Sequence, residues 1–304
     1  MNEKPIVIID TDPGHDDALA IMLLIKSGKA NVRAITTVAG NVDIQKTTNN
    51  ARFVLDLIGS DTPIFSGSEK PLKKELIHAN VHGVSGIDGA DVIKKEKLNG
   101  LAIDKIIEIV RANPGKVTIV TIGPETNIAK AFLRDPELPK LIKQIVIMGG
   151  AINVPGNKSR VAEFNIFVDP DAAKTVFNAP VRKVLIPLDI CNETPLFLKD
   201  FQKIRGKLRT SILSMMKKYI KGIAKFENFK GALVYDALAT YFLINPKAYK
   251  LEKTDIRIET TGEYTSGMSV ADQRAWGEKN PNVDLVIKIG REAFVKDFIS
   301  YLSD

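Results

Sequence analysis

Six short runs of mainly valine and isoleucine, separated by stretches with helical periodicity, restrict this chain most strongly to one kind of fold. The runs span residues 5–10, 32–40, 116–123, 144–150, 181–189 and 283–290. They show little alternation between apolar and polar residues, which is typical of strands that are covered on both faces. Strands that alternate with helices in this way predict an α/β protein with an open, mainly parallel, doubly wound sheet.

Two parts of the chain depart from this alternation. Residues 196–245 read as consecutive helices without a strand, so we expect a helical insertion near the open edge of the sheet. Residues 251–282 are ambiguous and leave room for a small antiparallel excursion before the last strand and a C-terminal helix over 291–302. Because no repeat or long linker interrupts the chain, residues 1–304 are expected to form one domain.

The composition indicates a cytoplasmic protein that binds neither nucleic acid nor membranes. Cys191 is the single cysteine, so no internal disulfide can form and a reducing compartment is expected. The N-terminus does not read as a signal peptide, and no apolar stretch reaches the roughly 20 residues of a membrane-spanning helix. The net charge of +7 comes from lysines scattered over predicted helix surfaces, without the basic face interleaved with aromatic residues that nucleic-acid binding favours.

Polar or glycine-rich segments follow five of the six predicted strands. These segments are residues 10–17, 40–41, 121–127, 148–157 and 189–192. The carboxyl ends of parallel strands meet at the same edge of a sheet, where ligands bind in open α/β folds. The convergence of five such segments therefore predicts one composite site.

The first of these segments, DTDPGHDD, places four carboxylates within eight residues. Pro13-Gly14 suits a tight turn from strand to helix, and acids at the start of a helix are favoured by its dipole. Capping needs only one acid, which leaves Asp12 unexplained. Carboxylates gathered in this way are the ligands of a hard cation such as Ca²⁺ or Mg²⁺. The alternative is a capped helix whose acids point into solvent.

A second polar cluster lies at 163–177, in the sequence EFNIFVDPDAAKTVF. Asp169-Pro170 is a good helix start. Glu163 and Asn165 just upstream would share one face of an extended segment and could hold a polyhydroxyl ligand. Asp236 lies in apolar helical sequence, where it would either cap the helix or need a metal or partner.

The three histidines do not indicate zinc. His78 and His82 have metal spacing, but that spacing needs a helix, and Gly83 and Gly86 favour a mobile loop. No G-x-S-x-G, phosphate-binding loop or G-x-G-x-x-G motif occurs, so serine hydrolases, nucleotide kinases and NAD enzymes lack their main motifs.

These residues stand in stretches that together resemble the nucleoside hydrolase family, the inosine-uridine-preferring nucleoside N-ribohydrolases. The matching stretches are DTDPGHDDALA, TTVAGN, HGVSG, IGPETNIA, IVIMGGA, GN followed by AEFNIFVDPDAA, and the region of Asp236. The resemblance implies a Rossmann-like sheet of the nucleoside hydrolase type. It also implies a calcium-dependent enzyme that cleaves the bond between ribose C1′ and the base of a ribonucleoside, and that assembles as a homodimer or homotetramer.

The resemblance also implies the roles of individual residues. Asp12 would bind calcium and act as general base on the attacking water. Asp17, Asp236 and the backbone carbonyl of Ile122 would complete the protein ligands, and Asp10 would support them without touching the ion.

The sugar would be held by residues that the same resemblance assigns to the ribose hydroxyls: Asp16, Asn41, Asn157, Glu163 and Asn165, with Met148 nearby. Calcium suits this task because its large coordination sphere accepts both oxygens of a cis-diol. The transition state of glycoside cleavage is oxocarbenium-like, and a carboxylate-rich pocket stabilises its positive charge.

The sequence departs from the family pattern where the leaving base would be protonated. Many members carry histidine just before the last metal-binding aspartate, and this chain has Tyr235 there, a poorer proton donor at neutral pH. His82 becomes the leading replacement. Purines often need protonation, so we expect a preference for pyrimidines such as uridine. Glu125 and Cys191-Asn192 are smaller departures, and they bear on base selectivity.

Two other functions compete with this interpretation. The first is a nucleoside- or ribose-binding protein that has lost turnover, which Tyr235 motivates and the retained Asp12 opposes. The second is a phosphatase of the haloacid dehalogenase type, because Asp-x-Asp after a first strand also opens that fold. The later lysine and paired acids of such phosphatases are not clearly present.

Overall fold

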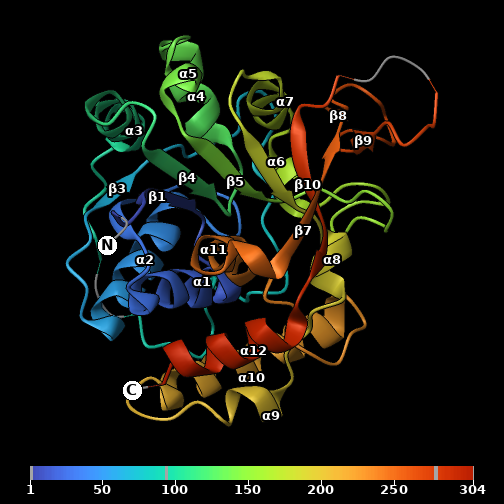
Figure 1. Cartoon of the computed structure of the whole chain (residues 1–304). Coiled ribbons are helices and arrows are strands. Elements are labelled where there is room, and N and C mark those ends of the chain that lie inside the picture. Colours follow the sequence, from blue (N-terminus) through green and yellow to red (C-terminus); the bar gives the residue numbers. More distant parts are fainter. Residues whose placement is uncertain (1–2, 93–94, 277–279, 304) are drawn as a thin grey trace.

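The protein is built on one large central sheet. The computed structural model describes residues 3–92, 95–276 and 280–303. Eight strands lie in the order β3-β2-β1-β4-β5-β6-β10-β7 (Figure 1). The parallel strands are β1 (Ile6–Thr11), β2 (Asn31–Thr37), β3 (Ile64–Ser66), β4 (Val117–Thr121), β5 (Gln144–Met148), β6 (Lys183–Ile186) and β10 (Val283–Ile289), and β7 (Tyr249–Thr254) pairs antiparallel with β10. The predicted open, mainly parallel α/β fold is confirmed.

Each predicted run contains one strand, but most strands end before their run does. The run 32–40 ends as a strand at Thr37, because the backbone then turns and Ala39 N–H donates to Ser68 C=O at 2.9 Å. The sequence analysis missed β3, which has only three residues, and β7, whose exposed lysines are typical of an edge strand.

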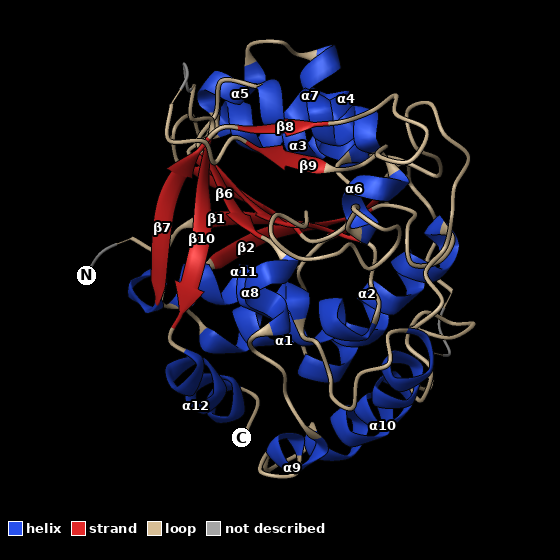
Figure 2. Ribbon diagram, turned by 90° about the vertical axis from the view of Figure 1, so that its right-hand side faces the viewer, coloured by secondary structure: helices blue, strands red, loops and turns tan. Residues whose placement is uncertain are grey.

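Helices cover both faces of the sheet (Figures 1 and 2). One face carries α3 (Ala102–Ala112), α4 (Thr126–Arg134), α5 (Leu138–Leu141) and α7 (Pro170–Asn178). The other carries α1 (His15–Ser27), α2 (Ile44–Ile58), α8 (Leu188–Asn192), α11 (Tyr235–Ile244) and, farther out, α12 (Arg291–Tyr301). Residues of β1 alternate between the two cores, since Ile8 belongs to the first and Val7 and Ile9 to the second. This explains the unbroken apolar run.

The stretch 196–245 holds α9 (Leu198–Phe201), α10 (Arg209–Phe226) and α11. The expectation that all of it lies near an open edge is wrong for α11, which packs against α1 and β5 in the interior of the sheet. The apolar sequence of α11 is buried there almost completely, because sheet and helices surround it. This placement brings Asp236 to the first strand's turn.

The stretch 251–282 contains the antiparallel excursion that the sequence allowed. After the short 3₁₀ turn Pro246–Ala248 and β7, the strands β8 (Ile256–Ile258) and β9 (Ser269–Ala271) form a separate antiparallel pair. Ile256 and Ile258 pack into the core on the α7 side. Over residues 3–92, 95–276 and 280–303, the helices are all too short or too polar to cross a membrane.

Candidate active site

The polar segments predicted at the strand ends meet near the middle of the sheet. The chain leaves β1 for β2 and β3 on one side and then crosses to β4 on the other, so the switch of direction falls between β1 and β4. Such a switch point leaves a crevice at the carboxyl ends of the strands. Asp12 follows β1 there, and Ile122 follows β4.

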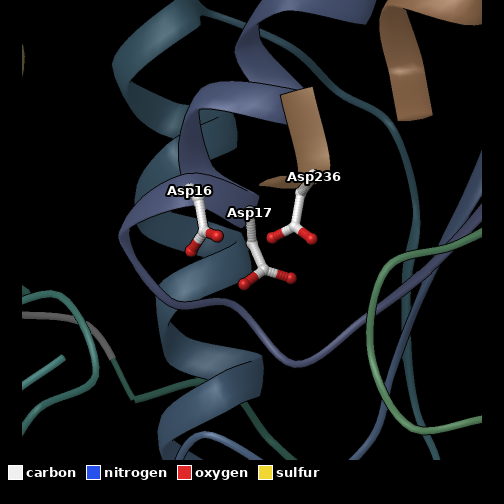
Figure 3. Close-up of side chains that lie close together, drawn as sticks. All are labelled: Asp16, Asp17 and Asp236. Carbon is white, nitrogen blue, oxygen red and sulfur yellow. The ribbon is translucent and has the colours of Figure 1, made fainter. Parts of the chain in front are cut away.

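Three carboxylates from two helices point at one another (Figure 3). Asp16 and Asp17 lie in the first turn of α1, as predicted, and Asp236 lies in the first turn of α11. One oxygen from each can be chosen so that all three lie within 4.8 Å of one another. The side chain of Asp236 does not cap its helix. The alternative of acids spread into solvent is wrong, because all three are buried.

Asp12 stands beside this group with one oxygen held and one free. Its Oδ2 accepts a hydrogen bond from Asn41 N–H at 2.6 Å. Its Oδ1 is buried and has no hydrogen-bond partner among the described residues, and the same is true of Asp16 Oδ1. Buried carboxylate oxygens without partners are costly. A cation or a water molecule in contact with both would remove that cost.

Burial raises the pKa of the Asp12, Asp16 and Asp236 carboxyls well above their ordinary range, and the neighbouring carboxylates raise it further. Burial also raises the pKa of Asp17, against hydrogen bonds from Thr11 Oγ1 at 2.5 Å and Gly14 N–H at 2.8 Å. Four acids are thus confined where their charges repel. A divalent cation would stabilise all of them in the ionised form, and hard oxygen donors fit such an ion.

A cavity of about 220 Å³ opens above these acids. Ten of the twelve predicted site residues line it: Asp16, Asn41, His82, Ile122, Met148, Asn157, Glu163, Asn165, Tyr235 and Asp236. The remaining two, Asp12 and Asp17, are fully buried next to it. The lining residues thus come from segments far apart in the chain, and of the five predicted strand-end segments only 189–192 contributes none.

The expectation of an extended segment at Glu163 and Asn165 is wrong. Glu163 is the N-cap of the short helix α6 (Phe164–Val168), and its carboxylate accepts from Asn165 N–H at 2.9 Å and Ile166 N–H at 3.2 Å. Burial raises the pKa of Glu163 to about 7. The helical turn aims Asn165 inward, where its Nδ2 donates to the carbonyls of Ile122 and Met148, both at 3.3 Å.

His82 lies in a loop, as predicted, but it is buried. Its ring stacks with the rings of His15 and Tyr219 at centroid distances of 5.5 and 5.2 Å. His82 Nδ1 accepts from His15 N–H at 3.3 Å, and its Nε2 lies 3.9 Å from Asp16 Oδ1. Burial lowers the pKa of His82 well below its ordinary value. The neutral ring is therefore the stable form.

Tyr235 faces the cavity and donates from its hydroxyl to Glu227 Oε2 at 3.1 Å. The sequence analysis missed Glu227 and several other residues that line the cavity: Asn80, Val81, Lys158, Phe164, Tyr219 and Phe226. Helix α10 contributes Tyr219 and Phe226, and Glu227 follows its last turn. The sequence analysis looked for site residues after strands, so it did not consider this helix. The family-like motifs do not extend over that helix either.

The two smaller departures from the family pattern lie outside the cavity lining. Glu125 is fully buried at the start of α4, where its carboxylate has no hydrogen-bond partner among the described residues. Cys191 is buried in α8, and Asn192 lines an adjoining hollow that Tyr235 and Glu227 share. Neither Glu125 nor Cys191 can touch a ligand in the main cavity without a rearrangement.

Comparison with known proteins extends over nearly the whole chain. Residues 7–296 match the model of the inosine-uridine preferring nucleoside hydrolases. The chain is 36% identical to a pyrimidine-specific ribonucleoside hydrolase, RihA, of Shigella boydii, over 95% of each chain. Its structure is similar to a plant nucleoside hydrolase, with 29% identity, TM-score 0.91 and coverage of 99% of each chain. It is also similar to a purine-preferring ribonucleoside hydrolase from Gardnerella vaginalis, with 28% identity, TM-score 0.89 and 98% coverage of each.

Proposed function

Because the chain belongs to the inosine-uridine preferring nucleoside hydrolase family and is a nucleoside hydrolase, we propose that it cleaves ribonucleosides in a calcium-dependent reaction with uridine as the preferred substrate. The family resemblance predicted from the motifs is confirmed, and a nucleoside hydrolase takes the place of both the binding protein and the phosphatase. The observation that carries the proposal is the free, buried Asp12 Oδ1 beside the three clustered acids.

Asp12 is the general base in this proposal. Its Oδ2 is held by Asn41, so its orientation is set before substrate binds. Its unpartnered Oδ1 takes a proton from water as the water oxygen bonds to ribose C1′ and the bond from C1′ to the base nitrogen breaks. The raised pKa of Asp12 shows how unfavourable its charge is without a cation or proton nearby.

The residues present fit a hard divalent cation. Asp12, Asp17, Asp236 and the carbonyl of Ile122 would hold it, and all four groups offer oxygen ligands; Asp236 and Ile122 line the cavity, and Asp12 and Asp17 are buried. When bound, Ca²⁺ supplies positive charge that gathers ribose hydroxyls and favours loss of a proton from water. Asp16 belongs to the same cluster, so it can serve both the cation and the sugar.

The ribose site in this proposal consists of polar groups around the acids: Asp16, Asn41, Met148, Asn157, Glu163 and Asn165. Asn41 is oriented because its Nδ2 donates to the Asp12 carbonyl at 3.1 Å, and Asn157 because its Oδ1 accepts from Phe164 N–H at 2.9 Å. Groups held in this way position a sugar with little loss of entropy on binding. Glu163 and the acids below it favour the positive charge that grows on the ribose.

The preference for pyrimidines is supported by Tyr235 and by the similarity to RihA. A histidine beside the last aspartate could protonate a purine, and tyrosine does so poorly. His82 and Tyr235 both line the cavity and are the two groups first expected to assist the leaving base.

Removal of divalent cations tests the metal requirement. We expect dialysis against EDTA to reduce uridine hydrolysis at least about 100-fold, because the positive charge that binds ribose hydroxyls and favours loss of a proton from water would then be missing. Ribose release should return when Ca²⁺ is added back, and more fully than with Mg²⁺, which tolerates an irregular ligand set less well. Isothermal titration calorimetry measures the binding of each ion to the chelated enzyme. Full activity in the chelated enzyme would contradict the proposal.

Substitution Tyr235→His tests the origin of base preference. We expect the ratio of inosine to uridine kcat/KM to rise at least about tenfold, because imidazole donates a proton near neutral pH. Tyr235→Phe is the matched control, since it keeps the ring and adds no acid. An unchanged ratio in Tyr235→His would remove this residue from the account of selectivity.

We also propose a cytoplasmic location and a homodimer or homotetramer, as expected from the single cysteine and the family resemblance. Light scattering of the purified protein decides the assembly. A monomer at micromolar concentration would contradict it.

A further inference from the structure

Glu227 is an acid in the cavity to which neither the motifs nor the comparisons assign a role. It follows the last turn of α10, where its N–H donates to Ile223 C=O at 2.8 Å. Its side chain lines the cavity together with Tyr235, and its Oε2 accepts the Tyr235 hydroxyl. It also lines the adjoining hollow, so it stands where the two spaces meet.

The position is unfavourable for a carboxylate on stability grounds. A negative charge at the C-terminal end of a helix opposes the helix dipole. The chain continues through Asn228 at φ 53°, a left-handed conformation in which asparagine commonly ends helices. The helix dipole therefore does not account for an acid at Glu227.

Burial and repulsion by Asp16 oppose a negative charge on Glu227, whereas the hydrogen bond from Tyr235 favours it. Asp16 of α1 and Glu227 repel each other, and the hydroxyls of Tyr219 on α10 and Tyr235 on α11 lie nearby. Lys158 is the cation in the cavity lining, but its Nζ is held by the His78 carbonyl at 2.9 Å. Burial raises the pKa of Glu227 above its ordinary value. In a protonated Glu227, Oε1 would be the oxygen free to donate, because Oε2 accepts from Tyr235.

We propose that Glu227 is the acid that protonates the departing nucleobase, and that Tyr235 positions it. The inference rests on the proposed nucleoside hydrolysis. Glu227 Oε1–H gives its proton to the base as the C1′–N bond breaks and its electron pair moves to the base. Asp12 takes the proton of the attacking water, and exchange with solvent later returns Asp12 and Glu227 to their starting states. No other reactant is needed.

Tyr235 makes this transfer easier. Its hydroxyl donates to Oε2, which leaves Oε1 to carry the acidic proton. The bond strengthens when Glu227 becomes negatively charged, because hydrogen bonds to ionised acceptors are stronger than those between neutral groups. Tyr235 therefore stabilises the transition state more than the ground state.

His82 is less well arranged for the same task. Its Nδ1 lies 3.3 Å from the His15 backbone nitrogen and 3.2 Å from His15 Nδ1, and its Nε2 lies 3.9 Å from Asp16 Oδ1. The ring is also enclosed between His15 and Tyr219. The ring nitrogens of His82 therefore face His15 and Asp16, whereas Glu227 lies on the side of Tyr235.

The experiment compares a leaving group that needs an acid with one that does not. Wild-type enzyme and Glu227→Gln are assayed with uridine, inosine and 4-nitrophenyl β-D-ribofuranoside in Ca²⁺. We expect kcat for the nucleosides to fall at least about 100-fold in Glu227→Gln, because glutamine cannot donate a proton. The leaving group of the nitrophenyl riboside departs as a stable anion, so kcat for this substrate should fall less than about threefold. In Tyr235→Phe, kcat for the nucleosides should fall about tenfold, again with little loss for the nitrophenyl riboside.

Glu193→Gln is the matched control, because Glu193 also caps a helix C-terminus but is exposed and outside the cavity. It should resemble wild type with all three substrates. Equal losses in Glu227→Gln with nucleosides and nitrophenyl riboside would overturn the proposal, and so would a rise in KM alone. A wild-type enzyme that releases ribose from no nucleoside would instead refute the proposed function, and this inference with it.

Discussion

Replacement of Asp12 by asparagine should lower kcat for uridine by at least about 100-fold while leaving the fold intact. Asparagine has nearly the shape of aspartate, and its side-chain oxygen can still accept the hydrogen bond from Asn41 N–H. It cannot take a proton from water. Steady-state assays of ribose release, together with thermal unfolding, separate this chemical defect from a loss of stability.

Asp10→Asn is the matched control for this variant. Asp10 and Asp12 are both fully buried and lie two residues apart, Asp10 in β1 and Asp12 just after it, so each variant replaces one buried carboxyl by an amide in the same part of the chain. Asp10 Oδ1 accepts from Thr36 Oγ1 at 2.5 Å and Asn127 Nδ2 at 2.8 Å, contacts that face the sheet and α4. We expect kcat of Asp10→Asn to fall by less than about tenfold. Similar losses in both variants, or a wild-type rate in Asp12→Asn, would refute Asp12 as the base.

A methyl group at Gly40 should inactivate the enzyme almost as strongly, although Gly40 has no side chain of its own. A Cβ placed there would overlap the Asp12 carboxylate and approach Pro124 Cδ at 3.0 Å. The opposite side is closed too, because a Cβ at Gly123 would lie 2.7 Å from Asp12 Oδ1. Gly40→Ala must therefore turn Asp12 out of its orientation. We expect kcat/KM to fall at least about 100-fold, since small misplacements of a catalytic group have effects of that size.

Gly290→Ala provides the comparison for Gly40→Ala. Gly290 lies before α12, far along the chain, with φ −76° and only Ala248 O at 3.7 Å from a new Cβ. The activity of the Gly290→Ala variant should equal that of wild type. The crucial measurement is kcat/KM alongside Ca²⁺ affinity and the melting temperature. An active Gly40→Ala variant would mean that the Asp12 carboxylate is not held between the two glycine loops.

The sequence was informative where a residue's role follows from its neighbours in the chain. Strands β1, β2, β4, β5, β6 and β10 match the predicted runs, with β1 and β2 each extending one residue beyond theirs, because both faces of each strand must be apolar. Asp16 and Asp17 start a helix as the Pro13-Gly14 turn predicted. The parallel order brought Asp12, Asn41 and Ile122 to one edge, because all parallel strands end there.

Local pattern did not determine which distant side chains would face the acids. Asp236 enters the cluster because α11 packs under β5, and nothing in its own segment distinguished this from helix capping. The same holds for Tyr219 and Glu227, which reach the cavity because α10 crosses beyond α1. His82 became buried through stacking with rings from two helices. Short-range periodicity thus specified the strands and the edge of the sheet where they end. The packing of helices remote in sequence determined which groups surround the leaving base, because burial and charge there depend on contacts that no single segment contains.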